Sequence, residues 1–256
     1  MHKLTSAVAF ATSLSLSLAP AIATDFVATP QSLAGVNLHE VTAVIAPPQM
    51  TAESAEAELR AAFHSHADAN LPRVAPGQER EDFAAWMRAP HNREQVVAFY
   101  MHLKSNGVED VVPVWQLVRT SSSWRQCGAS GFEVAPREKW DNIVKTLKFV
   151  EKDVVPAVGK VQAVSGYRNE HLNRCSNGAP ASAHRHFTAL DLVPADPSVT
   201  RARLVSQVCA AHAREGRAND TGLGFYNGVR FHVDSNGFRR WGANGSGATS
   251  PCVTYS

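Results

Sequence analysis

Residues 222–241 read GLGFYNGVRFHVDSNGFRRW, and this stretch decides the fold class. Two or three short strands are expected in it, around Gly224–Tyr226, Val229–Asp234 and Phe238–Trp241. Strands that are this short and this close in sequence favour an antiparallel sheet built from hairpins. Such a sheet needs helices to cover its apolar face, and the preceding residues supply them.

The region before this stretch is expected to combine helices with further strands. Pro136–Val154 carries apolar residues at helical spacing and is the clearest helix in the chain. The other expected elements are a strand at Val161–Val164, a polar loop that reaches Ala183, a strand at Ala189–Val193 and a helix at Thr200–Arg214. We therefore predict an α+β fold, with helices packed on a small antiparallel sheet.

The N-terminal third is expected to be a small helical region. Helical patterns cover AESAEAELRAAFHSH at residues 52–66, then Glu79–Arg88 and Asn92–Ser105. We therefore divide the body of the chain into a helical region at 51–110 and a second domain at 111–256.

The first residues are predicted to be an export signal. A short basic start is followed by an apolar stretch and a small-residue cleavage site ending at Ala23, so residues 1–23 are interpreted as a signal peptide. The apolar run is short for a membrane anchor, and no later segment is long enough to span a bilayer. Residues 24–50 have scattered prolines and are expected to form a linker or extended arm. The mature chain is then a periplasmic or secreted soluble protein without a membrane span.

The composition excludes several classes of protein. The chain has 256 residues, of which 44% are hydrophobic and 19% charged, so it can build a core and is neither disordered nor fibrous. A formal net charge of +2 argues against a nucleic-acid partner. The sequence does not indicate an oligomeric state.

Four cysteines, without a CxxC pair, are expected to form two disulfides in an oxidising compartment. Three pairings are possible. The pairing Cys127–Cys175 with Cys209–Cys252 is preferred, because Cys252 lies in a C-terminal tail that would benefit from a tether.

Two stretches carry candidate metal ligands. His184 and Asp191 lie in SAHRHFTALDLV, and His232 lies in GVRFHVDS. Strand alternation places Asp191 on the face opposite Leu190 and Leu192. On the later strand it places Arg230, His232 and Asp234 on one face, opposite an apolar face. Two histidines and one aspartate leave a fourth position for water, as a catalytic zinc requires. The residues alone leave a second interpretation open, in which these side chains are ordinary core or surface groups.

Three ordered motifs resemble those of the M15 family of zinc peptidases. They are SGYR at 165–168, SxHxxxxxxD at 182–191 and GLGFYxxxxFHVD at 222–234, and the trailing FRRW at 238–241 also fits. The similarity covers roughly residues 127–242. The nearest group in the family contains D-Ala-D-Ala carboxypeptidases and murein endopeptidases, which share a fold with the Hedgehog signalling domain.

The resemblance implies roles for individual residues. His184, Asp191 and His232 would be the Zn²⁺ ligands, and Arg168 would bind a substrate carboxylate or the developing oxyanion. From the residues alone, Arg168 is instead a structural salt bridge at the end of a strand. Asp234 is the candidate general base, or else a group that orients the His232 imidazole.

The chain departs from the family pattern at two positions. Phe187 stands where the family usually has glycine. Its larger side chain would narrow the pocket or shift the loop. Val229 stands where several branches carry the general base.

The expected function is that of an exported zinc metallopeptidase that hydrolyses peptide bonds of peptidoglycan stem peptides, at a D-Ala-containing bond of the D-Ala-D-Ala carboxypeptidase type. One alternative is a non-catalytic, zinc-containing module that binds peptidoglycan. A third interpretation is a disulfide-stapled exported domain without any site.

Other histidines are not included among the candidate metal ligands. His64, His66 and Asp68 resemble a compact metal motif, but on a helix residues two apart diverge by about 200°. His212 shares a helical face with apolar residues and is expected in the core. His171 is a candidate for substrate contact.

Overall fold

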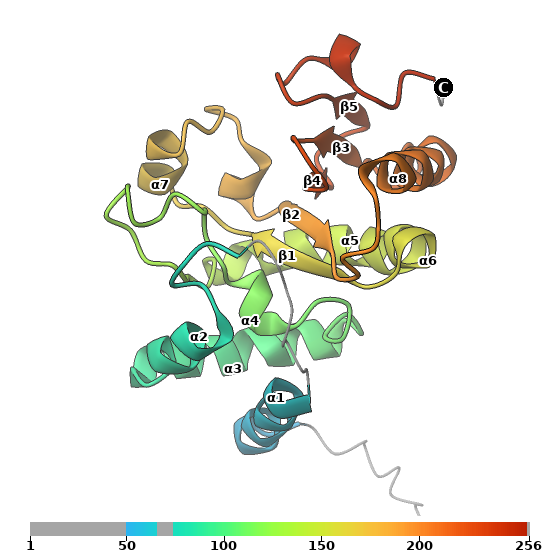
Figure 1. The fold of residues 1–256 in the computed structure, drawn as a ribbon. Helices are drawn as coiled ribbons and strands as arrows, with labels where there is room; N and C mark the ends of the chain where they lie inside the picture. The colour runs from blue at the N-terminus through green and yellow to red at the C-terminus, as the bar shows by residue number, and fades with distance from the viewer. Residues whose placement is uncertain (1–49, 66–73, 255–256) are drawn as a thin grey trace, which may run out of the picture. The chain divides into compact units, whose positions relative to one another are not determined.

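The computed structural model describes residues 50–65 and 74–254. The expected signal peptide, nearly all of the expected linker, and the side chains of His64, His66 and Asp68 lie outside the described residues. The helices are α1 (Ala52–Ser65), α2 (Arg80–Trp86), α3 (Pro90–Ser105), α4 (Val114–Leu117), α5 (Trp140–Phe149), α6 (Val155–Val158), α7 (Glu170–Cys175) and α8 (Arg201–Glu215), shown in Figure 1. Shorter helical turns are η1 (Arg137–Lys139), η2 (Val150–Val154), η3 (Ala183–His186) and η4 (Gly247–Thr249).

Five strands form one sheet in the order β1-β2-β4-β3-β5. Their bounds are β1 (Val161–Ser165), β2 (Ala189–Pro194), β3 (Gly222–Phe225), β4 (Phe231–Asp234) and β5 (Arg239–Trp241). The predicted α+β class, with helices on a small sheet, is confirmed. The sheet is mostly antiparallel, as expected, and β5 differs in that it runs parallel to β3. Both edges of β4 are taken by β2 and β3, so the chain leaving β4 turns back and joins the outer edge of β3.

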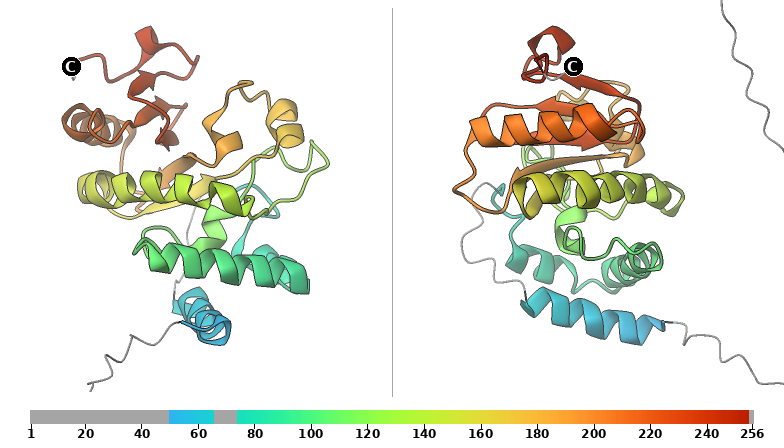
Figure 2. Two further views of the ribbon diagram at one scale, coloured as in Figure 1. Left: turned by 180° about the vertical axis from the view of Figure 1, so that it is seen from behind. Right: turned by 90° about the vertical axis from the view of Figure 1, so that its right-hand side faces the viewer.

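The face of the sheet opposite the candidate ligands is apolar. Leu190, Leu192, Phe231 and Val233 are each 3% exposed or less and belong to the main hydrophobic core. Helix α5 packs against β2, and in both Figure 1 and the left view of Figure 2 the α5–α6 segment lies across β1 and β2. This packing leaves the polar face of the central strands free for a site.

The long helix predicted at Pro136–Val154 is divided into pieces. It begins as the 3₁₀ turn η1, continues as α5, widens into a π turn at η2 and ends as α6. Pro156 lies in α6 and has no backbone N–H to donate, so a regular α-helical ladder cannot run through this point.

Two short helices were not predicted. Helix α7 lies in the segment expected as a polar loop, and its N-cap Asn169 accepts a hydrogen bond from Leu172 N. Helix α4 fills the apolar run at Val114–Leu117. Both are too short to show a hydrophobic period.

The N-terminal helices share the core of the second half of the chain. Phe99 on α3 packs against Trp140 and Phe187, with ring centroids 5.3 and 5.7 Å apart. The domain boundary expected at residue 110 stays a prediction.

The preferred cysteine pairing is confirmed by disulfides at Cys127–Cys175 and Cys209–Cys252. Among the described helices, none combines the length and apolar character needed to cross a bilayer.

Candidate metal centre

The structure brings the three predicted ligands together. Asp191 on β2 and His232 on β4 are directly opposite each other across the sheet, and His184 comes from η3 just before β2. His184 is 2% exposed, His232 is 5% exposed and Asp191 is fully buried. The alternation argument therefore placed Asp191 and His232 on the correct strand faces, whereas the position of His184 depends on the loop that folds over them.

Three potential ligand atoms converge on one point. His184 Nε2 lies 3.2 Å from His232 Nδ1 and 3.3 Å from Asp191 Oδ1, and His232 Nδ1 lies 3.1 Å from the same oxygen. Ligand atoms on a tetrahedral zinc at about 2.0–2.1 Å would be about 3.3 Å apart. The cluster has the dimensions to hold a metal ion.

The outer nitrogen of each imidazole fixes which nitrogen faces inward. His184 Nδ1 lies 2.6 Å from the Gly166 carbonyl oxygen, which can only accept, so Nδ1 carries the proton and Nε2 presents a lone pair. His232 Nε2 lies 2.8 Å from Asp234 Oδ2, and the same reasoning leaves a lone pair on Nδ1. Two lone pairs and a carboxylate oxygen therefore face one another, an arrangement that a cation would stabilise.

Burial and charge shift the pKa values in the directions that metal binding needs, with one exception. Burial, aided by the Arg168 charge, lowers the pKa of His184 to about 4. Burial alone would raise the pKa of Asp191, but the neighbouring imidazoles and the Arg230 guanidinium outweigh it and hold that pKa well below its usual value. His232 is the exception: burial opposes its protonation, yet its two carboxylate partners raise its pKa. A metal must displace this proton.

Asp191 also accepts hydrogen bonds from three side chains other than the histidines. Its Oδ2 accepts from Arg168 Nη2 at 2.8 Å and from Arg230 Nη2 at 2.7 Å, and its Oδ1 accepts from the Tyr226 hydroxyl at 2.9 Å. Arg168 also donates from Nε to Ser165 Oγ at 3.2 Å. The arrangement contains the salt bridge expected from the residues alone, and it also places Arg168 on the cleft.

Sequence reasoning gave no role to Arg230 or Tyr226. Both belong to the motif that carries His232, and the alternation that placed His232 and Asp234 on one strand face also placed Arg230 there. Alternation therefore located the arginine but did not identify Asp191 as its partner.

Asp234 is fully buried and uses both carboxylate oxygens. Oδ2 accepts from His232 Nε2 at 2.8 Å and from Arg239 Nη2 at 2.9 Å, while Oδ1 accepts from Arg239 Nη1 at 2.9 Å and from Asn236 N at 2.8 Å. Burial would raise the pKa of this carboxyl, but His232 and Arg239 lower it. Asp234 is therefore an ionised partner of the His232 imidazole.

A cleft of about 530 Å³ opens above the cluster. His184 and His232 form part of its lining, together with Arg168, Tyr226, Arg239, Arg240, Trp241 and small residues between Ser176 and Gly247. None of the described lining residues is acidic. The cleft therefore suits a ligand with negative charge.

Trp241 forms one wall of this cleft beside His232, with ring centroids 5.1 Å apart. The indole lies directly over Gly224, where a Cβ atom would be 2.3 Å from the Trp241 ring. Glycine at 224 is therefore required for the tryptophan to lie against the histidine.

The two departures from the family pattern lie outside the cleft lining. Phe187 is 1% exposed and packs among core aromatic rings, so it does not narrow the pocket. Its φ of 54° is in the left-handed region, which explains why glycine is favoured at such a position. Val229 is half-buried and packs against the core.

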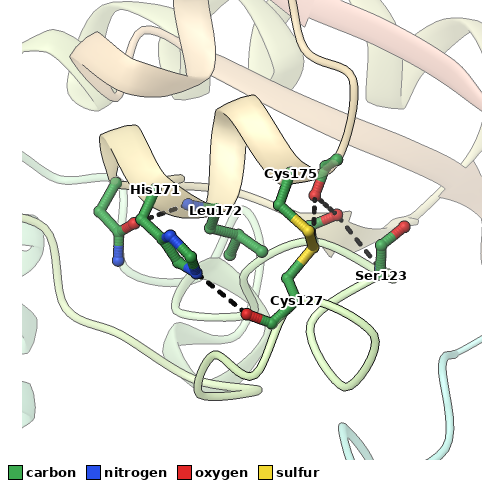
Figure 3. The surroundings of a disulfide bond; sticks show 8 residues. Ser123, Cys127, His171, Leu172 and Cys175 are labelled. Carbon is green, nitrogen blue, oxygen red and sulfur yellow. Dashed lines mark hydrogen bonds between the residues drawn. A yellow bond between two sulfur atoms is a disulfide. The ribbon is translucent and has the colours of Figure 1, made fainter.

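A disulfide anchors another segment of the cleft lining. Cys127–Cys175 joins the 121–131 loop to the end of α7, directly before Ser176 (Figure 3). His171 is a candidate for substrate contact, but it is not part of the cleft lining. Its Nε2 lies 3.0 Å from the Cys127 carbonyl oxygen. His212 is buried in the core as predicted, and its Nε2 lies 2.8 Å from the Thr221 carbonyl oxygen.

A buried set of converging ligand atoms at the floor of a basic cleft is an arrangement typical of metal-dependent hydrolases. Residues 118–234 match the family model for Peptidase M15, and the chain carries a Peptidase M15 domain over these residues. This match confirms the resemblance that the motifs indicated, and it includes all three candidate ligands. Searches of curated proteins and of solved structures found no match.

Proposed function

We propose that this chain is an exported zinc peptidase that hydrolyses peptide bonds of peptidoglycan stem peptides, at a D-Ala-containing bond next to a free carboxylate. The observation that carries the proposal is the convergence of His184 Nε2, Asp191 Oδ1 and His232 Nδ1 within a Peptidase M15 domain. Zinc is typical of this family, and the imidazole and carboxylate donors suit it. The two disulfides agree with an oxidising compartment.

The proposed zinc would be held by His184, Asp191 and His232. When bound, it would supply Lewis-acid activation of the scissile carbonyl and of a water molecule. Arg168 lines the cleft beside these residues, and its Nη1 makes no hydrogen bond with the described residues. That nitrogen can donate to the terminal carboxylate of a peptide or to the oxyanion that develops during hydrolysis.

Of the two roles open to Asp234, we propose the orienting one. Its four hydrogen bonds occupy both oxygens, and one of them fixes the proton on His232 Nε2. Asp234 would then keep the inward-facing nitrogen of His232 unprotonated and correctly aimed.

One observation favours the alternative of a non-catalytic peptidoglycan-binding module. No carboxylate is among the described residues that line the cleft, and Val229 stands where several family branches carry the general base. Turnover separates the two functions, because both predict zinc at the cluster.

The deciding experiment is mass spectrometry of muropeptides after purified sacculi are incubated with zinc-loaded residues 24–256. We expect a zinc-dependent loss of D-Ala, abolished by a chelator and by His232→Ala. His186→Ala is the matched control, since His186 is exposed and lies outside the cleft lining. One zinc bound per chain with no mass change would favour the binding module instead.

A further inference from the structure

The residues that close the β3–β4 hairpin both reach the buried ligand on the neighbouring strand. Tyr226 N donates to the Arg230 carbonyl oxygen at 3.1 Å, which pairs the two residues across the turn. The Tyr226 hydroxyl binds Oδ1 of Asp191, and the Arg230 guanidinium binds Oδ2. The hairpin thus holds the carboxylate by both oxygens and fixes its rotation.

Asp191 has two cationic partners on a single oxygen, and they differ in where they lie. Arg168 is part of the cleft lining, whereas Arg230 is not. Arg230 is instead held beside the Tyr226 ring, with its guanidinium carbon 5.1 Å from the ring centroid.

One carboxylate oxygen needs only one of these two donors. If Arg168 turned toward an anionic substrate and Arg230 were absent, Oδ2 of the fully buried Asp191 would lose both of its arginine donors, and an unpaired buried carboxylate oxygen is unfavourable. Arg230 remains in place because it does not face the cleft. The second guanidinium therefore makes the movement of the first one inexpensive in free energy.

We propose that Arg230 is a positioning residue that orients Asp191 and compensates its charge, leaving Arg168 available for the free carboxylate of a substrate peptide. This inference rests on the proposed function. It assigns the two arginines separate tasks: Arg230 supports zinc binding, and Arg168 supports substrate binding.

The test compares Arg230→Met with Arg168→Met in the full mature chain. Zinc affinity is measured by competition with a chromophoric chelator, and peptide affinity by calorimetry with an acylated D-Ala-D-Ala peptide and its C-terminal amide. We expect Arg230→Met to weaken zinc binding about tenfold, as the loss of a group that orients a ligand typically does. We expect Arg168→Met to leave zinc affinity within about twofold and to remove the preference for the carboxylate over the amide.

Two further variants separate this role from a structural one. Arg230→Lys keeps the charge and is expected to recover most of the zinc affinity, although lysine lacks the planar fork of arginine. Tyr226→Phe removes the hydroxyl from Oδ1 without changing charge and still reports on orientation if Arg230→Met does not fold.

The inference would be overturned if Arg168→Met lowered zinc affinity and Arg230→Met did not. Arg168 would then be the residue that compensates the charge of Asp191. Equal affinities in all variants would also overturn it. Zinc affinities can be compared without turnover. A wild-type protein that binds zinc but releases no D-Ala would therefore refute the proposed function. The order of zinc affinities among the variants would still decide the role of Arg230.

Discussion

Replacing Asp234 by asparagine tests how the protein controls the protonation of His232. The aspartate accepts four hydrogen bonds, two at each oxygen, and its side chain is fully buried. In asparagine one of the two oxygens becomes an NH₂ group, which cannot accept. Two of the four donors therefore lose their acceptor, whichever way the amide turns.

The size of the effect depends on which donors can find water. The Arg239 side chain is 41% exposed, so its guanidinium can be solvated. The remaining loss is one buried donor, either His232 Nε2 or Asn236 N, at about 1–3 kcal/mol of folding stability. If His232 Nε2 loses its acceptor, the proton is free to move to Nδ1, the nitrogen that faces the other ligands. We therefore expect Asp234→Asn to weaken zinc binding by about 10–100-fold, equivalent to about 1.4–2.7 kcal/mol.

Zinc competition against a chromophoric chelator measures the affinity, and urea unfolding of the metal-free protein measures the stability. Arg239→Met is the matched control because it removes the ion pair and leaves Asp234 on His232, so its zinc affinity should change by less than about threefold. If Asp234→Asn bound zinc within about twofold of wild type and had no turnover, the orienting role would be refuted. Asp234 would then be the general base.

Three further predictions address the cleft wall, the core and the disulfide. Gly224→Ala places a methyl group against the Trp241 indole and should raise KM while costing about 1–3 kcal/mol of stability; an unchanged KM would remove Trp241 from the substrate site. Burial lowers the pKa of His212, so its neutral form is favoured in the folded state. Its contribution to stability should be present above the unfolded pKa of about 6.5 and should be lost as the pH falls through the lower pKa of the folded state. Urea unfolding at pH 8 to 5 should therefore show a steeper loss for wild type than for His212→Gln, and parallel curves would contradict the assignment. Replacing both Cys127 and Cys175 by serine frees a loop spanning 48 residues and should lower the free energy of unfolding by about 4 kcal/mol. Denaturant unfolding measures this loss, and a loss below about 1 kcal/mol would mean that the loop is held by its other contacts.

The strand faces of His232 and Asp234 were predictable because a strand has a strict period of two. Once Phe231 and Val233 are assigned to the core, His232 and Asp234 must face the other side. His184 was found through the motif spacing and not through periodicity, since its position on η3 depends on a loop. The strand face of Arg230 followed from the same alternation as that of His232, but alternation gives a face and not a partner.

The strand order and the short helices could not be predicted from the sequence, for a different reason. The parallel pairing of β5 arises because both edges of β4 are already occupied, which only the complete sheet reveals. Helix α7 has six residues and is fixed by its Asn169 cap and by the disulfide at Cys175. Neither constraint produces a repeating pattern of apolar residues.

The two kinds of element around the site divide its tasks. Asp191 and His232 come from central strands that are hydrogen-bonded on both sides, so their backbones are held by neighbours and their separation is set by the sheet. The walls of the cleft come from the segment after Cys175 and from the edge strand with its following loop, which have fewer backbone constraints. Because a change in the walls leaves the ligand separation intact, it should alter substrate affinity first, whereas a change in the central strands should alter metal affinity first. The fold can therefore accommodate changes in the cleft walls without rebuilding the candidate metal centre.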